Sequence, residues 1–192
     1  MFPNSATASR PAFAHHLPLK KILCTSALKP ETPSMNKANQ EKLDWVELKS
    51  PKGKYHIFRR HISLAMGGKK DTGTWGGGHP FDLELTRIPP GATNWPHHAH
   101  SAQWELYIIL SGCGRVRTPE GWQNIGPGDS FIHPPGEPHQ IHNNGTEDLL
   151  YYVVADNPQA DIGTYPDSGK WFAKPQRKTF EIVEVNYYKG EE

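Results

Sequence analysis

One stretch of this sequence, residues 96–105, reads Pro96-His97-His98-Ala99-His100-Ser101-Ala102-Gln103-Trp104-Glu105. It places three histidines within four residues and follows them with one carboxylate. Imidazole and carboxylate groups together suit zinc, iron, nickel, copper or manganese. Because successive side chains of a β-strand point to opposite faces, residues two apart share a face. If the stretch is extended, His98 and His100 can hold one ion together, while His97 points away.

Composition limits the classes of function. A chain of 192 residues favours one main domain with a real core. Its formal charge of +1 gives no reason to expect a nucleic-acid or membrane partner. Eighteen glycines and eighteen prolines suit many short strands joined by tight turns. The main anomaly is a concentration of histidines at positions 97, 98, 100, 133, 139 and 142.

Residues 1–40 differ in composition from the rest of the chain. They are rich in Ser, Thr, Ala, Pro and Asn and show no sustained apolar period, so they cannot offset their ordering entropy by burial. We therefore predict a disordered extension over residues 1–40 and a single domain over residues 41–192. The basic, acid-poor character of residues 1–34 also fits an organelle transit peptide, and a third interpretation is that Met35 is the functional start.

Cysteine usage bears on the compartment. The two cysteines, Cys24 and Cys113, do not form a disulfide framework, and a reducing environment is the simpler interpretation. We predict a cytoplasmic protein, with an organelle as the alternative if residues 1–34 are a transit peptide.

From Leu43 onward the chain alternates between short apolar segments and turn residues. Residues 66–78 and 165–171 are expected to be loops, and no helix is expected between Leu43 and Tyr188. Many short strands with turn signals between them predict an all-β sandwich or barrel. After a first strand or arm near residues 43–48, the predicted strands are 55–62, 81–87, 105–110, 114–118, 130–133, 139–143, 149–155 and 180–187.

The histidine stretch has two further components. Glu105 begins the next predicted strand, and His139 opens a later strand after the rigid turn at residues 134–138. Three neutral imidazoles and one carboxylate would hold a divalent ion and leave positions open for water or substrate. The alternative is that these histidines are ordinary polar residues of a barrel without a metal.

Four more side chains are candidates for contact with a substrate: Trp95, Gln103, Tyr107 and His133. Gln103 and Tyr107 share strand parity with Glu105, whereas Trp95 would form a dry wall. Two of them, Gln103 and His133, have a structural alternative. Gln103 would then pack at the strand entrance, and His133 would satisfy the polar groups of the turn that follows it.

Two spacings resemble the sequence motifs of the cupin superfamily. Gly91, six residues, His98-x-His100, four residues, Glu105, six residues and Gly112 resemble the first motif. Gly128, five residues, Pro134-x-Gly136, two residues, His139, three residues and Asn143 resemble the second. The one departure is the gap before the histidine pair, because the usual gap of five residues after Gly91 would make His97 the first histidine. The spacing to Glu105 favours His98 as the ligand, with His97 as the competitor.

This resemblance covers residues 81–155 and implies a double-stranded β-helix, the jelly-roll barrel of the cupins. It implies a divalent metal (Mn, Fe, Ni, Zn or Cu) bound by His98, His100, Glu105 and His139. It also implies a homodimer formed through N-terminal strands, which residues 43–62 would supply. A weaker resemblance, at residues 156–158 and 165–171, is to small single-domain bacterial cupins whose roles are mostly undefined.

Two kinds of function fit such a site. The first is a metal-dependent isomerase, decarboxylase or dioxygenase acting on a small oxygen-rich metabolite that chelates the ion. The second is a non-catalytic module that binds or senses a sugar or carboxylate. The four predicted ligands are the same in both cases, so they do not choose between them.

Overall fold

The computed structural model describes residues 36–192. The transit-peptide interpretation and most of the predicted extension lie outside these residues. A short 3-10 helix, η1 (Gln40–Lys42), opens the described part, and the Asn39 side chain caps it by accepting a hydrogen bond from the Glu41 amide. The Tyr152 hydroxyl donates to Gln40. The domain boundary at residue 41 stays a prediction.

The described residues are almost entirely strands and turns, which confirms the predicted all-β class. Two further helices are a single turn each, α1 (Ile62–Ala65) and η2 (Thr74–Gly76). None of the helices in residues 36–192 is long and apolar enough to cross a membrane. The strands are β1 Val46–Lys49, β2 His56–His61, β3 Phe81–Ile88, β4 Ala99–His100, β5 Glu105–Ser111, β6 Gly114–Thr118, β7 Gly121–Ile125, β8 Ser130–His133, β9 Gln140–His142, β10 Leu149–Asp156, β11 Asp161–Tyr165, β12 Lys170–Lys174 and β13 Lys178–Glu181.

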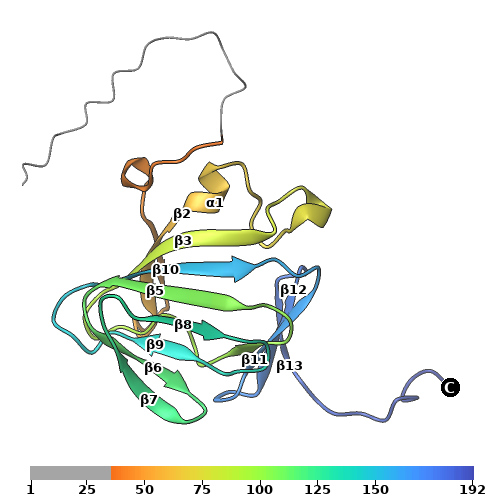
Figure 1. Ribbon diagram of the computed structural model, residues 1–192. Helices are drawn as coiled ribbons and strands as arrows, with labels where there is room; N and C mark the ends of the chain where they lie inside the picture. Colours follow the sequence, from red (N-terminus) through yellow and green to blue (C-terminus); the bar gives the residue numbers. More distant parts are fainter. Residues whose placement is uncertain (1–35) are drawn as a thin grey trace, which may run out of the picture. The chain divides into compact units, whose positions relative to one another are not determined.

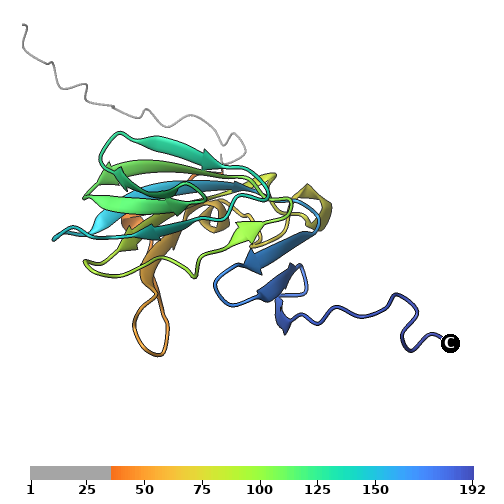
Figure 2. The same ribbon diagram turned by 90° about the horizontal axis from the view of Figure 1, so that it is seen from below.

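The strands form three antiparallel sheets. The largest has six strands in the order β1-β2-β3-β10-β5-β8, and the others are β7-β6-β9 and β13-β12-β11-β4. Figure 1 shows β3, β10, β5 and β8 side by side. Figures 1 and 2 both place β11, β12 and β13 at one end of these longer strands. Non-consecutive strands are neighbours within the sheets, as the predicted jelly roll requires.

One apolar core joins the six-stranded and three-stranded sheets. Its buried members come from both, including Tyr107 and Ile109 of β5, Tyr151 of β10, Val116 of β6 and Ile141 of β9. In β5 the side chains alternate, so that Tyr107 and Ile109 are buried while Leu110 is exposed. A period of two is what allows one face of the strand to fill the barrel. The double-stranded β-helix is therefore confirmed.

The register of β5 places Glu105 and Tyr107 on the inner face of the barrel. Glu105 of β5 lies opposite Ala155 of β10 on one side and His133 of β8 on the other. Tyr107, two residues further, shares the inward face with Glu105. Both side chains therefore point into the barrel from its central strands.

Some predicted elements are wrong. A one-turn helix, α1, follows β2 where no helix was expected. The expected loop at residues 165–171 is instead the turn of the β11–β12 hairpin, and β11 also pairs with β4. The sequence did not predict β11 because Asp161 and Gly163 are residue types with low strand preference. The predicted strand 180–187 ends at Glu181, and beyond it no described strand pairs with the alternating apolar residues. Val183 is therefore 78% exposed.

Candidate metal centre

The two motif segments are held together by their backbones. His98 and His139 form an antiparallel bridge in which the His98 amide donates to the His139 carbonyl at 3.2 Å and the His139 amide donates to the His98 carbonyl at 2.8 Å. The two rings lie 4.6 Å apart between centroids. The Gly136 amide donates to the His100 carbonyl at 2.7 Å, which ties the turn before His139 to β4. Residues distant in sequence are thus fixed side by side.

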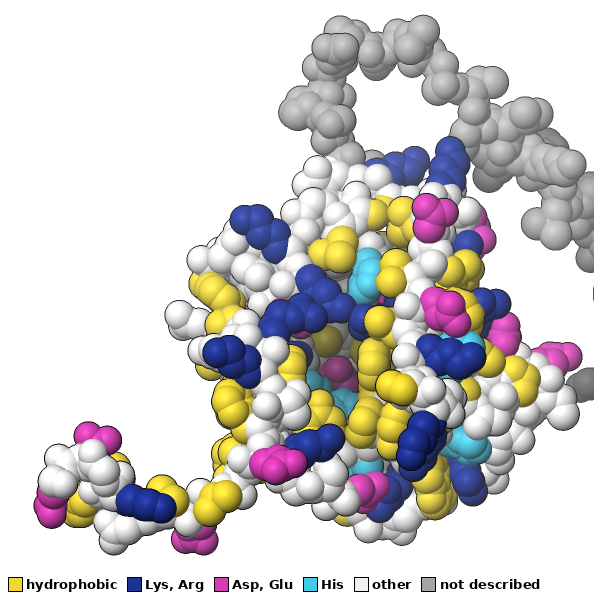
Figure 3. All heavy atoms as spheres, turned by 180° about the vertical axis from the view of Figure 1, so that it is seen from behind, with side chains coloured by type: hydrophobic (Ala, Val, Ile, Leu, Met, Phe, Trp, Pro, Cys, Tyr) yellow, Lys and Arg dark blue, Asp and Glu magenta, His cyan; other side chains and the backbone are white. Residues whose placement is uncertain are grey.

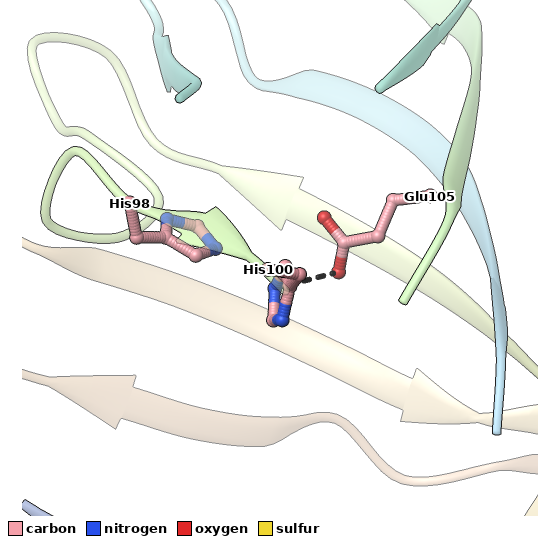
Figure 4. Close-up of side chains that lie close together, drawn as sticks. All are labelled: His98, His100 and Glu105. Atoms are coloured by element: carbon pink, nitrogen blue, oxygen red, sulfur yellow. Dashed lines mark ion pairs between the residues drawn. The ribbon is translucent and has the colours of Figure 1, made fainter. Parts of the chain in front are cut away.

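The ligand atoms of three predicted residues converge. One ring nitrogen each from His98 and His100 and one carboxylate oxygen of Glu105 lie within 4.8 Å of one another. Figure 4 shows the His100 imidazole on β4 and the His98 imidazole just before it, with the Glu105 carboxylate directed towards them from β5. His139 contacts the same carboxylate, with Nε2 at 2.9 Å from Oε2 of Glu105. The structure therefore brings together all four predicted ligands.

Each histidine is oriented through its other ring nitrogen. Nδ1 of His98 lies 2.8 Å from the Pro96 carbonyl, and Nδ1 of His139 lies 3.1 Å from the Glu137 carbonyl. Nδ1 of His100 lies 2.6 Å from Oδ2 of Asp161. All three partners accept hydrogen bonds, so Nδ1 carries a proton in each ring and Nε2 is the atom left to bind a metal. Nε2 of His139 donates to Glu105 in this structure, and a bound metal would replace that proton. Histidines that bind metals are held by this arrangement, which supports a metal in this site.

Electrostatics also match the needs of a metal site. Burial, together with the charges of His139 and His100, lowers the pKa of His98 to about 3, so its imidazole is neutral at pH 7. Burial alone would raise the pKa of Glu105, but the charges of His100 and His139 hold it well below its usual range. A neutral imidazole and an ionised carboxylate are the forms that ligate divalent ions.

His97 is separate from this group. Its side chain is buried and directed to the turn after β11, where Nδ1 lies 3.4 Å from Oδ1 of Asp167. It does not join the converging ligand atoms of His98, His100 and Glu105. His97 and His98 therefore point in different directions, as expected for neighbours in an extended segment. Which of the two binds a metal stays a prediction.

The residues predicted to contact substrate occupy two kinds of position. Trp95 and Gln103 line cavities that also reach Glu105, and Gln103 donates to the Asp156 carbonyl and accepts from Lys174. Tyr107 lines the same cavity as Gln103, whereas His133 lies behind His139. The Tyr107 hydroxyl donates to Glu105 at 2.7 Å, and the His133 ring stacks on His139 at 4.1 Å between centroids.

Sequence reasoning missed Asp161. Its carboxylate is 1% exposed and accepts from the Ala102 amide at 2.9 Å and the Ser101 hydroxyl at 3.3 Å, in addition to its contact with His100. Burial alone would raise the pKa of Asp161, but His100 and these donors lower it to about 2. Asp161 and His100 are 61 residues apart, and no motif spacing announces the pair.

Three of the four predicted ligands, His98, His100 and Glu105, line an open cavity of about 290 Å³. Its walls include Trp95, Tyr165 and Phe172, and its other wall residues are mostly charged. Figure 3 shows this hollow, with His and acidic side chains at its base and Lys and Arg side chains beside it. The cavity is large enough for a small metabolite and too small for a folded partner.

Comparisons with known proteins agree with the fold. Residues 84–155 match the family model described as a cupin domain. Auxin-binding protein 1 of Arabidopsis thaliana is 30% identical over 125 residues, a match that covers 58% of this chain and 56% of the relative. The chain thus spans about half the length of this curated relative.

Two solved structures resemble the chain in fold. A sugar phosphate isomerase of the cupin superfamily from Silicibacter pomeroyi aligns with a TM-score of 0.64 at 18% identity, covering 79% of this chain and 97% of its own. A predicted oxalate decarboxylase from Thermotoga maritima aligns with a TM-score of 0.51 at 21% identity, covering 62% of this chain and 97% of its own.

Proposed function

We propose that this chain, whose residues 84–155 match the cupin domain family model, binds one divalent transition metal through His98, His100, Glu105 and His139 and uses it to hold a small oxygen-rich metabolite. The observation that carries this proposal is the shared orientation of the three histidines. Each has its Nδ1 engaged by an acceptor, so Nε2 is the nitrogen that each ring can offer to a metal beside the Glu105 carboxylate. Manganese, iron, nickel, zinc and copper all accept such a set of donors.

A bound ion would supply Lewis acidity to a carbonyl or hydroxyl oxygen of the metabolite. The protein's own side chains orient the ligands. Burial and the Glu105 charge raise the pKa of Tyr107 well above its usual range, so its hydroxyl stays protonated and donates to Glu105. This hydrogen bond fixes the carboxylate while leaving the face towards the cavity open.

We propose that an enzyme with this site would be an isomerase, a decarboxylase or a dioxygenase. The structural relatives are named for an isomerase and a decarboxylase, so the shared fold does not select one reaction. The second candidate is a module that binds a sugar or carboxylate without turnover. Its support is the curated relative, which is named for binding a ligand rather than for a reaction.

Metal content tests the proposal directly. Protein purified without chelators should carry close to one transition metal ion per chain, measured by plasma mass spectrometry. His100→Ala and His139→Ala should each remove the ion, because each deletes one donor. His142→Ala is the matched control, since His142 lies three residues from His139 but contacts Thr93 instead of the ligands.

A folded wild-type protein that binds none of these metals would end the proposal. Enzyme and binder are then separated by identifying small molecules that co-purify with the metal-loaded protein and incubating them with it. Conversion to a product supports an enzyme, whereas saturable binding of an unchanged molecule supports the binding module.

A further inference from the structure

Four basic side chains surround the cavity that contains the metal ligands. They come from separate segments: Arg59 from β2, Lys70 from the loop after α1, Lys174 from β12 and Arg177 from the turn that follows β12. All four line the cavity of about 290 Å³ together with His98, His100 and Glu105. Figure 3 shows Lys and Arg side chains gathered along one side of the hollow.

Carboxylates engage three of these four cations. Nη1 of Arg59 donates to Glu84 at 2.9 Å, and Arg177 donates to Asp71. Nζ of Lys174 lies 3.8 Å from Asp71 and donates to Gln103 at 2.9 Å. Arg59, Lys174 and Arg177 are therefore held in place around the cavity by partners within the protein.

Lys70 is different. Among the described residues, no carboxylate oxygen lies within 4.0 Å of its Nζ and no side-chain hydrogen bond engages it, although the side chain is half-buried. Burial, and then the charge of Arg59, lower the pKa of Lys70, and the charges of Glu84 and Asp71 oppose this shift. A partly buried ammonium that no carboxylate contacts directly is costly, and an anion from solution would compensate for it.

Arg59 brings a second cation to the same cavity. Its Nη1 is engaged by Glu84, and its guanidinium lies 5.2 Å from the Trp95 ring centroid. Guanidinium and ammonium groups together recognise phosphate and carboxylate oxygens. Lys70 and Arg59 thus place two positive charges on the wall of one cavity.

The carboxylates of the cavity match the cations in number. The cavity and the smaller one beside it contain Asp71, Asp82, Glu84 and Glu105, which are four carboxylates against four cations. Burial raises the pKa of Asp82, which disfavours its ionised form. A divalent ion held by Glu105 would therefore leave the cavity with a net positive charge.

We propose that the metabolite bound by the metal carries a second, anionic group, a phosphate or a carboxylate, which binds to Lys70 and Arg59. This inference rests on the proposed metal site and narrows its substrate class to anionic metabolites. The ion holds the oxygen-rich end, and the Lys70–Arg59 pair holds the acidic end. A neutral sugar would leave the ammonium of Lys70 without a partner.

Matched ligands test this proposal on the manganese-loaded full-length protein. Glycerate supplies a hydroxy acid for the metal alone, 3-phosphoglycerate adds a phosphate, and malate adds a carboxylate. Isothermal titration should show 3-phosphoglycerate or malate binding about tenfold or more tightly than glycerate, and the stronger of the two identifies the acidic group. Lys70→Met should abolish that advantage, while Lys70→Arg should keep most of it.

Lys178→Met is the charge-matched control, because Lys178 is exposed on β13 and lines neither cavity. Thermal unfolding establishes that each variant is folded. The inference is overturned if neither acidic ligand exceeds glycerate, or if the advantage survives in Lys70→Met.

A separate measurement distinguishes failure of the metal site from failure of the anion site. Inorganic phosphate is titrated into the protein as purified, whatever its metal content. Phosphate binding that Lys70→Met removes and Lys178→Met retains supports the anion site even if no metal is found. A protein that binds metal and glycerate but no phosphate or acidic ligand keeps the proposed function and loses the anion site.

Discussion

The contact between Asp161 and His100 makes a quantitative prediction about metal affinity. In Asp161→Asn the new side chain has one oxygen and one amide nitrogen in place of two oxygens. The Ala102 amide and the Ser101 hydroxyl both donate to Oδ1 of Asp161, so the asparagine oxygen is best placed there. Its amide nitrogen then faces Nδ1 of His100, where Oδ2 now accepts at 2.6 Å.

Two donors cannot face each other at that distance. His100 must therefore move its proton to Nε2, and a protonated Nε2 cannot bind a metal. Loss of such an orienting partner lowers metal affinity about 10–100-fold, or about 1.4–2.8 kcal/mol. Because Asp161 is 1% exposed, solvent cannot replace the lost acceptor, and we expect the upper end of this range.

The assay is a competition between the protein and a chromogenic chelator for zinc at pH 7.5. Long-range nitrogen–proton NMR reports the tautomer of His100 in the same samples. Asp167→Asn is the matched control, because Asp167 lies beside His97 and pairs with Arg117 at the surface. We expect its zinc affinity to remain within about twofold of the wild type.

Two results would refute this reasoning. Wild-type affinity in a folded Asp161→Asn protein would show that Asp161 does not set the His100 tautomer. A large loss of zinc affinity in Asp167→Asn, with none in Asp161→Asn, would indicate that His97 binds the metal instead of the His98–His100 pair.

Three other predictions concern the register, the turns and the N-terminus. His98→Ala should remove the metal and His97→Ala should retain it, measured by metal content; the opposite pattern would place the register one residue earlier. Gly112→Ala should lower the free energy of unfolding by about 1–3 kcal/mol, because φ is +79° and the new Cβ would lie 2.3 Å from the Asp148 carbonyl oxygen. Gly91→Ala, at φ +75° with nothing within 4 Å of the Cβ, should cost less in the same urea titrations, and equal costs would contradict the steric argument. Deleting residues 1–34 should leave solubility and metal content unchanged, and an insoluble product would show that the extension is needed for the fold.

Much of the fold could be predicted because the central strands follow a simple period. Alternation in residues 81–87 and the apolar run 149–155 correspond to β3 and β10, whose pairing builds the middle of the largest sheet. The prediction failed where pairing depends on distant partners. β11 exists because Gly163 and Thr164 pair with β4, and its own sequence has weak strand preference. Conversely, residues 182–187 alternate well but find no described partner.

The candidate site divides in the same way. Local spacing identified His98, His100 and Glu105, since two-residue parity and a short turn determine where these side chains lie. Asp161, Lys70 and Arg59 could not be found by spacing, because three-dimensional packing alone brings their segments to the cavity. The proposed homodimer and the cytoplasmic location stay predictions.

The backbone bridge between His98 and His139 has a kinetic consequence. Its paired amides join residues 41 positions apart, so forming the bridge requires the chain between them to close into a long loop, which costs entropy. His139 can therefore join the other three predicted ligands only after the second motif has docked against the first. Metal uptake during refolding should lag behind strand formation, and a metal-sensitive spectroscopic signal would mark the moment at which the barrel closes.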